Sequence, residues 1–136
     1  MGGLKRHHAL LALSRDHHHA LVLARRIRQA SVVDRELVAQ VADQFARELE
    51  PHFRLEESEL FPALEAAGAG DLTMLALEDH RRLRALIADA AGAGDSAIPL
   101  REFAVLLEDH VRFEERTLFE RAQALLDLTS LSTRLT

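Results

Sequence analysis

The sequence predicts a single all-α domain over residues 1–136, an up-down-up-down antiparallel four-helix bundle. Three observations predict it. Stretches rich in Ala, Leu, Arg and Glu alternate with short breaks that contain glycine or β-branched residues. Apolar residues recur at steps of three and four, and no stretch shows the two-residue alternation of a strand. The breaks are short, which makes consecutive helices antiparallel neighbours.

The predicted helices begin and end at these breaks in composition. The first helix ends at a polar, β-branched stretch, residues 31–34. Gly-Ala-Gly segments at 68–70 and 92–94 are typical stops for the second and third helices. The four helices are therefore predicted over residues 4–29, 34–66, 71–91 and 98–127.

Three prolines fall inside these ranges. Pro51 and Pro62 each remove a backbone donor and crowd the preceding turn. We therefore expect the second helix to kink at Pro51 and to kink or end early near Pro62. Pro99 falls in the first turn of the fourth helix, where proline is tolerated. The tail after Asp127 is rich in Ser and Thr and is expected to fray.

Composition excludes several classes of function. The 136 residues carry 17 basic and 22 acidic side chains, a formal net charge of −5, and no basic patch. Neither nucleic acid nor an anionic membrane surface is therefore an expected partner. No apolar run approaches the ~20 residues of a membrane span. Without cysteine there is no disulfide and no thiolate chemistry, and a cytoplasmic protein is expected.

The most informative feature is an internal repeat. Residues 52–61, HFRLEESELF, align without gaps to residues 110–119, HVRFEERTLF. The first and third helices match more weakly, through the Asp-His pairs at 16–17 and 79–80. The chain thus consists of two helical hairpins, each with one histidine followed by one His-x-x-x-Glu motif. A symmetric site at the centre of the bundle requires this arrangement.

The spacing within the repeat favours a metal site. Residues four apart lie on one face of a helix, so each His-x-x-x-Glu pair points at a common spot. Imidazole is a terminal ligand and a carboxylate can bridge two ions, a set that suits a transition metal of borderline softness, iron above all, at one or two centres. The candidate metal ligands are His17, His52, Glu56, His80, His110 and Glu114.

Neighbouring polar residues are assigned lesser roles. Surface positions are expected for His7, His8, His18 and His19. Glu57 and Glu115 are expected to face solvent or to contact the site from outside, and the aspartates that precede three histidines are expected to be solvated: Asp16, Asp79 and Asp109. Glu59 returns to the helix face of His52, so it is a candidate to orient an imidazole ring.

These motifs resemble the hemerythrin-like, or HHE cation-binding, family. The resemblance runs from Asp16-His17 to Glu114, and the doubled His-x-x-x-Glu-Glu-x-x-Leu-Phe stretch is its most specific part. It implies a four-helix bundle around an oxo- or hydroxo-bridged non-haem di-iron centre. Members bind dioxygen reversibly, or sense oxygen, iron or redox state. The ligands it implies are His17, His52, His80 and His110, with Glu56 and Glu114 as bridges.

The sequence departs from the oxygen-carrying hemerythrins in one ligand. Those proteins have a fifth histidine, from a His-x-x-x-His motif on the third helix. Here Ala76 and Arg84 stand four residues from His80 on either side, and neither is a typical ligand. Each ion would then keep an open position unless His18 or Glu59 supplies another ligand.

A second departure concerns the last carboxylate. The oxygen carriers place it five residues after its histidine, which would select Glu115 in this chain. The internal repeat and the four-residue geometry both favour Glu114 instead.

The leading hypothesis is a cytoplasmic di-iron protein that binds dioxygen or a related small oxidant, for oxygen, redox or iron sensing or for a stress response. The alternatives are a di-iron enzyme with peroxidase or ferroxidase-like activity, and a metal-dependent regulatory or interaction module. Zinc or manganese would fit the same ligands. Non-covalent bis-histidine haem stays open, although it gives the repeated glutamates no role. The Glu-x-x-His pair of ferritin-like bundles and the His-Glu-x-x-His motif of zinc proteases are absent.

Overall fold

The computed structural model describes residues 5–94 and 96–135, and all regular structure in these residues is helical. A 3-10 turn, His8–Leu10, leads into α1, Leu11–Gln29. The second segment comprises α2 (Arg35–Gln44), α3 (Glu50–Leu55) and α4 (Phe61–Ala66). The remaining helices are α5 (Gly70–Gly92), α6 (Ile98–Phe113), α7 (Phe119–Leu125) and α8 (Leu128–Leu131).

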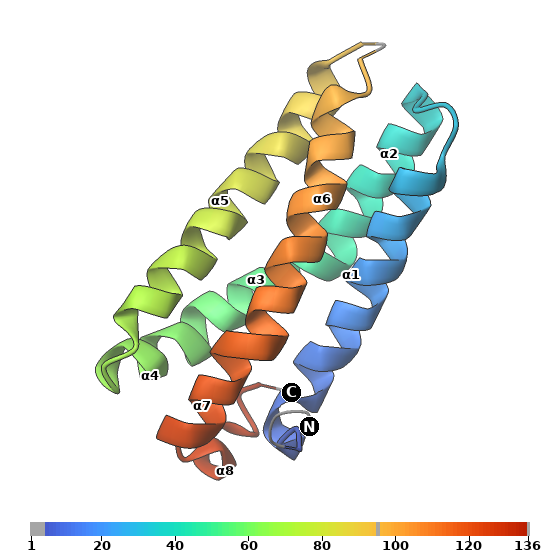
Figure 1. The fold of residues 1–136 in the computed structure, drawn as a ribbon. Helices are drawn as coiled ribbons and strands as arrows, with labels where there is room; N and C mark the ends of the chain where they lie inside the picture. Colours follow the sequence, from blue (N-terminus) through green and yellow to red (C-terminus); the bar gives the residue numbers. More distant parts are fainter. Residues whose placement is uncertain (1–4, 95, 136) are drawn as a thin grey trace.

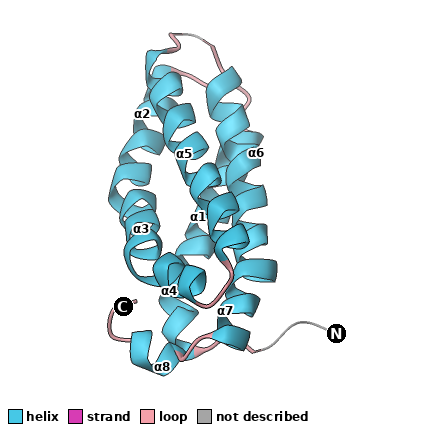
Figure 2. Cartoon of the chain, turned by 90° about the vertical axis from the view of Figure 1, so that its left-hand side faces the viewer, coloured by secondary structure: helices cyan, strands magenta, loops and turns pink. Residues whose placement is uncertain are grey.

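The long helices lie side by side as a bundle (Figure 1). α6 packs against both α1 and α5, and α2 and α4 pack against α5. The start of α1 and the short helix α8 lie at the same end of the bundle (Figure 2). No described helix combines the length and the apolar character that a bilayer crossing needs. The all-helical class predicted from the sequence is confirmed for the described residues.

The helical segments follow the composition of the chain. They cover residues 8–29, 35–66, 70–92 and 98–125, whereas 4–29, 34–66, 71–91 and 98–127 are predicted. Residues 1–4, 95 and 136 of the predicted domain lie outside the described residues. Asp34 caps α2 by accepting a hydrogen bond from the Leu37 amide at 2.9 Å. Gly68, with φ of +94°, ends α4 in the left-handed conformation that favours glycine.

Within the described part of the chain, three π-helical turns interrupt the helices: Phe45–Leu49, Glu56–Leu60 and Glu114–Leu118. Pro51 and Pro62 are each the second residue of the α-helical stretch that follows such a turn. The wider turn accommodates the proline ring, and π-helical turns are a known cause of helix bending. The third turn contains no proline and lies at the repeat-equivalent position of the second. The π-helical turn is therefore a feature of the internal repeat and not only of proline.

Two apolar clusters occupy the two ends of the bundle interior. One contains Ala20 and Leu23 of α1, and the other contains Leu10 and Leu13 just before them in the chain. His17 lies between these two groups on the same helix. On α5, His80 lies in the same way between Ala76 of the second cluster and Leu83 of the first. A polar layer that contains His17 and His80 therefore lies in the middle of the bundle, between the two apolar clusters.

The C-terminal tail differs from the sequence expectation. Residues 128–131 form α8, and the side chains of Leu128, Leu131 and Leu135 are buried in the second apolar cluster. The predicted fraying after Asp127 is therefore wrong for the described part of the tail. Apolar burial at this end of the bundle outweighs the weak helix propensity of the Ser and Thr residues.

Candidate metal centre

The polar layer consists of the six side chains that the sequence singled out. Among the described residues seven polar or charged side chains are buried, and one of them, Thr73, donates to a backbone carbonyl of its own helix. The other six are each at most 3% exposed: His17, His52, Glu56, His80, His110 and Glu114. The structure therefore brings all the predicted ligands together; their role as ligands stays a prediction.

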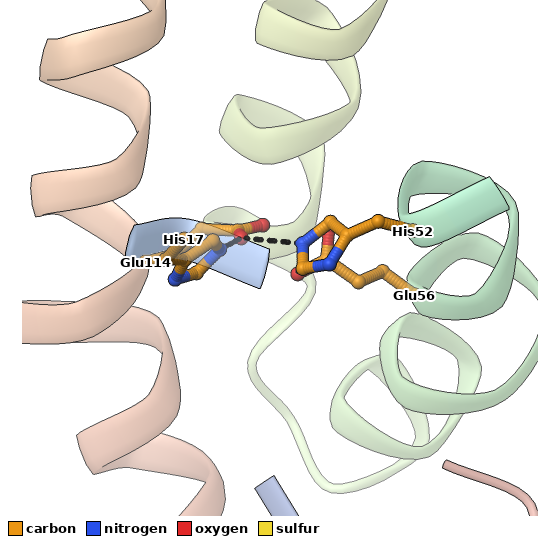
Figure 3. Close-up of side chains that lie close together, drawn as sticks. All are labelled: His17, His52, Glu56 and Glu114. Atoms are coloured by element: carbon orange, nitrogen blue, oxygen red, sulfur yellow. Dashed lines mark hydrogen bonds and ion pairs between the residues drawn. The ribbon is translucent and has the colours of Figure 1, made fainter. Parts of the chain in front are cut away.

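These six residues form two overlapping groups. His17 and His52 form one group with both glutamates, and His80 and His110 form the other with the same two glutamates. In each group the candidate ligand atoms all lie within 4.8 Å of one another. The ring centroids within each histidine pair are 4.9 Å apart. Figure 3 shows the first group, with His17 beside Glu114 and facing His52 beside Glu56.

Each glutamate presents one oxygen to each histidine pair. Glu114 Oε1 lies 2.8 Å from His17 Nε2, and its Oε2 lies 3.3 Å from His110 Nε2. Glu56 Oε2 lies 3.4 Å from His52 Nε2, and its Oε1 lies 3.2 Å from His80 Nε2. This is the placement expected of two carboxylates that each bridge two ions.

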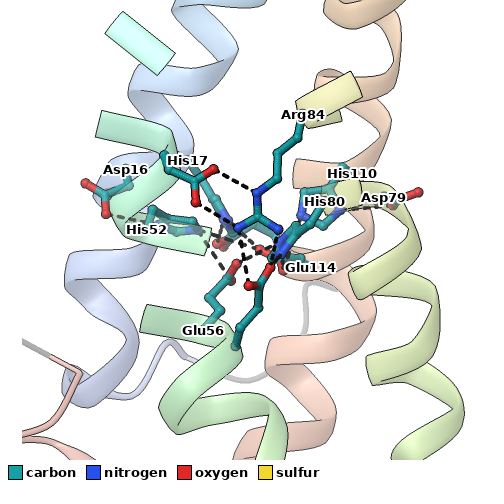
Figure 4. A network of polar contacts seen from close by, with 12 residues as sticks. Asp16, His17, His52, Glu56, Asp79, His80, Arg84, His110 and Glu114 are labelled. Carbon is teal, nitrogen blue, oxygen red and sulfur yellow. Dashed lines mark hydrogen bonds and ion pairs between the residues drawn. The ribbon is translucent and has the colours of Figure 1, made fainter. Parts of the chain in front are cut away.

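The other ring nitrogen of each histidine bonds to a carboxylate outside the cluster, and Figure 4 labels two of these carboxylates, Asp16 and Asp79. The Nδ1 atoms of His52 and His110 donate to Asp16 at 3.0 Å and to Asp79 at 2.9 Å. Those of His17 and His80 donate to Glu115 at 2.7 Å and to Glu57 at 2.6 Å. Such a partner fixes the ring orientation and directs Nε2 into the site, as around many metal-bound histidines.

These carboxylates form a closed ring around the bundle. α1 supplies Asp16 to the histidine of α3, and the π-helical turn after α3 supplies Glu57 to the histidine of α5. α5 supplies Asp79 to the histidine of α6, and the π-helical turn after α6 supplies Glu115 to the histidine of α1. Each of the four helical segments thus orients the histidine of the next one.

The inward atoms of the cluster are short of partners. The Nε2 atoms of His52, His80 and His110, both carboxylate oxygens of Glu56 and Oε2 of Glu114 are buried without a hydrogen bond. Buried polar atoms without partners are costly and rare in folded proteins. Because these atoms converge on one spot and are typical metal ligands, bound cations would satisfy them together. The residues present therefore fit a metal centre.

The electrostatics of the cluster also point to a cation. Burial lowers the pKa of His110, but Glu114 and the hydrogen bond to Asp79 outweigh burial and raise this pKa to about 10. The carboxylates likewise outweigh burial at His17 and His52 and raise both pKa values. Burial raises the pKa of Glu114, but the histidines outweigh it and hold that pKa well below its usual range. The carboxylates that raise these three histidine pKa values would attract a metal cation to the same inward nitrogens.

Two sequence expectations about the aspartates are wrong. Asp16 and Asp79 are not merely solvated, because each accepts a hydrogen bond from a buried histidine of the next helix. Asp109 is exposed, as expected. The repeated Asp-His dipeptide was the available signal, but its meaning depends on which helix lies alongside.

The glutamates next to the cluster contact it from outside. Glu57 and Glu115 each bond to the outer nitrogen of a histidine, one of the two roles expected for them. In a π-helical turn successive side chains diverge less than in an α-helix, so Glu56 and Glu57 reach opposite nitrogens of the same ring. The expectation for Glu59 is wrong: its carboxylate pairs with Arg134 at 3.5 Å.

The structure offers no histidine beyond the predicted four to this centre in its described part. His18 and His19 are exposed on the outside of α1. Arg84, one of the two residues four positions from His80, forms ion pairs with Glu50 and Glu57. For the last carboxylate, Glu114 is fully buried in the cluster whereas Glu115 contacts only the outer side of His17 among the six. The geometry favours Glu114.

Single substitutions should separate the cluster from its surface neighbours. His52→Ala and His110→Ala are expected to lower metal content and thermal stability together, because each removes one inward nitrogen and unbalances a buried carboxylate. His18→Ala, next to His17 but exposed, is expected to change neither. Metal analysis and thermal unfolding of the three purified variants test this. Equal metal content in all three would contradict the assignment of the ligands.

Four histidines and two shared carboxylates inside a helical bundle define a cation-binding helical domain. The comparison with known families agrees. The family model described as hemerythrin HHE cation binding domain matches residues 6–122. Because this match covers most of the chain, the protein belongs to the hemerythrin HHE family. No curated protein and no solved structure matches the chain.

Proposed function

We propose that this chain is a non-haem di-iron protein that binds dioxygen or a related small oxidant in the cytoplasm. Its site lies within an antiparallel up-down-up-down four-helix bundle. One observation carries the proposal: Glu56 and Glu114 each direct one oxygen to each of two histidine pairs. A single ion would not need this duplication. Two ions, each with two histidines and a share of both carboxylates, use every inward atom.

The donor set supports iron. Four imidazoles and two carboxylates are nitrogen and oxygen ligands of borderline softness, which suit iron and also accept zinc or manganese. Two histidines and two shared carboxylates would give each ion four protein ligands and would leave coordination positions for solvent and for an exogenous ligand. When bound, a reduced pair of irons supplies the electrons that dioxygen binding requires. The protein side chains hold the ions and exclude bulk water.

Burial supports a small ligand over a bulky one. The six side chains are at most 3% exposed and lie between two apolar clusters. An organic substrate would have to separate helices to reach them, whereas a diatomic molecule or peroxide would not. This favours an oxidant-binding or sensing role over a peroxidase with an organic co-substrate. A di-iron enzyme, above all a ferroxidase, is the alternative that the next experiment separates.

Metal analysis with an optical spectrum tests the proposal. Protein expressed with iron supplementation is expected to contain about two irons per chain and to show ligand-to-metal bands in the near ultraviolet. Anaerobic reduction followed by oxygen titration should change these bands reversibly. Catalytic consumption of peroxide or ferrous iron would favour the enzyme. Folded protein that takes up no iron after anaerobic reconstitution would contradict the proposal.

A further inference from the structure

The two halves of the site repeat in sequence but are held by different parts of the chain. Glu57 and Glu115 are equivalent residues of the repeat, and each orients the histidine of another helix. Each is in turn bound by one arginine. Arg84, in the middle of α5, holds Glu57, whereas Arg6, in the segment before α1, holds Glu115.

Arg84 binds its partners through a rigid fork. Its Nη1 and Nη2 atoms donate to the two oxygens of Glu57 at 2.9 and 3.2 Å, and its Nε and Nη2 atoms donate to Glu50 at 2.7 and 3.0 Å. The guanidinium also lies 5.6 Å from the centroid of Phe53, whose ring stacks on His80 at 3.9 Å. A bidentate pair of this kind fixes the carboxylate in both position and orientation.

Arg6 holds the equivalent carboxylate from the non-helical segment before the 3-10 turn, and one hydrogen bond instead of two joins the two side chains. Its guanidinium lies 5.5 Å from the centroid of Phe119, whose ring stacks on His17, so this contact repeats that of Arg84 with Phe53. Its Nη2 donates to the backbone carbonyl of Glu115 at 2.8 Å and to the side chain at 3.2 Å, and its Nη1 donates to Gln123 at 3.0 Å. The segment that carries Arg6 is fastened to α7 through Gln123, which also bonds to the His7 amide and the Lys5 carbonyl. Ser14 donates a further hydrogen bond to Glu115 at 2.8 Å.

From this difference we propose that Arg84 and Arg6 are positioning residues, one for each metal position, and that the two positions therefore bind ions unequally. The proposal rests on the dinuclear site proposed above. Arg84 preorganises the position of His80 and His110 from within a long helix, so this position binds the first ion more tightly. The position of His17 and His52 depends on docking of the segment before α1, so binding there includes the ordering of that segment. By linkage, an ion at this second position also favours the docked segment.

Titration of the metal-free protein with Co²⁺, followed in the visible spectrum against a competing chelator, tests the proposal. The wild type is expected to bind two ions in two resolved steps. Arg84→Leu is expected to weaken the tighter step, and Arg6→Leu the weaker step, by up to about 10-fold, the lower end of the usual cost of removing a direct partner of a ligand, because each arginine acts through a glutamate. The double variant should weaken both. Arg84→Lys and Arg6→Lys keep the positive charge but lose the planar guanidinium. The affinity of the affected step in each should lie between those of the wild type and of the leucine variant.

Matched controls exist on the same segments. Arg81 lies on α5 and pairs with the exposed Glu78, and the Lys5 side chain is exposed beside Arg6. Arg81→Leu and Lys5→Leu are expected to leave both steps unchanged, and circular dichroism checks that all variants keep their helix content. The proposal that the two positions differ in affinity would be overturned if the wild type binds both ions in one unresolved step. It would also be overturned if Arg84→Leu and Arg6→Leu weaken the same step. If both cobalt-binding steps keep the same affinity in every variant, the positioning roles of the two arginines are wrong. If the wild-type protein binds no Co²⁺ at all, the dinuclear site itself is wrong.

Discussion

Glu114→Ala is expected to remove both metal ions and to lower the free energy of unfolding by about 3–5 kcal/mol, the usual cost of deleting one partner of a buried ionic network. Glu114 is fully buried, and its two oxygens face different histidine pairs. Its loss leaves both metal positions short of a ligand. It also leaves the inward nitrogens of His17 and His110 without the carboxylate that they face in the metal-free protein.

Glu115→Ala is the matched comparison, because it changes the next residue on the same helical turn. Glu115 is 29% exposed and, among the six buried residues, contacts only the outer nitrogen of His17. This variant is expected to keep at least one ion and to lose less stability. Metal content by mass spectrometry and chemical unfolding measure both effects. If Glu115→Ala loses both ions while Glu114→Ala keeps them, the carboxylate five residues after His110 is the ligand.

The sequence predicts much of the cluster because its geometry is mostly local. His52 with Glu56 and His110 with Glu114 share a helix face whatever their neighbours do, so the four-residue spacing was sufficient. His17 and His80 could be placed because they interrupt apolar faces, where a polar side chain needs a partner. Helical periodicity also turns His18 and His19 away from the face of His17, and both are exposed in the structure.

The surroundings of the cluster depend on relations that no local pattern contains. Whether Asp16 faces solvent or His52 depends on the register between α1 and α3. The contact of Glu57 with His80 depends on a π-helical turn, which α-helical periodicity does not anticipate. Arg6 reaches Glu115 across 109 residues of chain. Contacts of this kind follow from packing, and the sequence alone gives no means to choose among them.

The stability of the metal-free protein is expected to fall as pH rises from about 6.5, the ordinary pKa of histidine. The folded protein raises the pKa of His110 to about 10 and also raises those of His17 and His52. Between these values the folded state binds more protons than the unfolded state. The stabilisation is therefore complete below the unfolded pKa and is lost as pH approaches the folded one. At acidic pH the lowered pKa of Glu114 acts oppositely, since its stabilisation is lost as pH falls.

Metal binding is expected to reverse this dependence above pH 6.5. A metal ion held by the inward nitrogens of His17, His52 and His110 would compete there with protons, so affinity for the ion should increase with pH over the same range in which the metal-free protein weakens. Thermal unfolding of both forms between pH 6 and pH 9 should give melting temperatures that diverge as pH rises. His110→Ala should reduce the slope of the metal-free curve, and His18→Ala should leave it unchanged. If the melting temperatures of the two forms change in parallel with pH, protons and metal ions do not compete for the same histidine nitrogens.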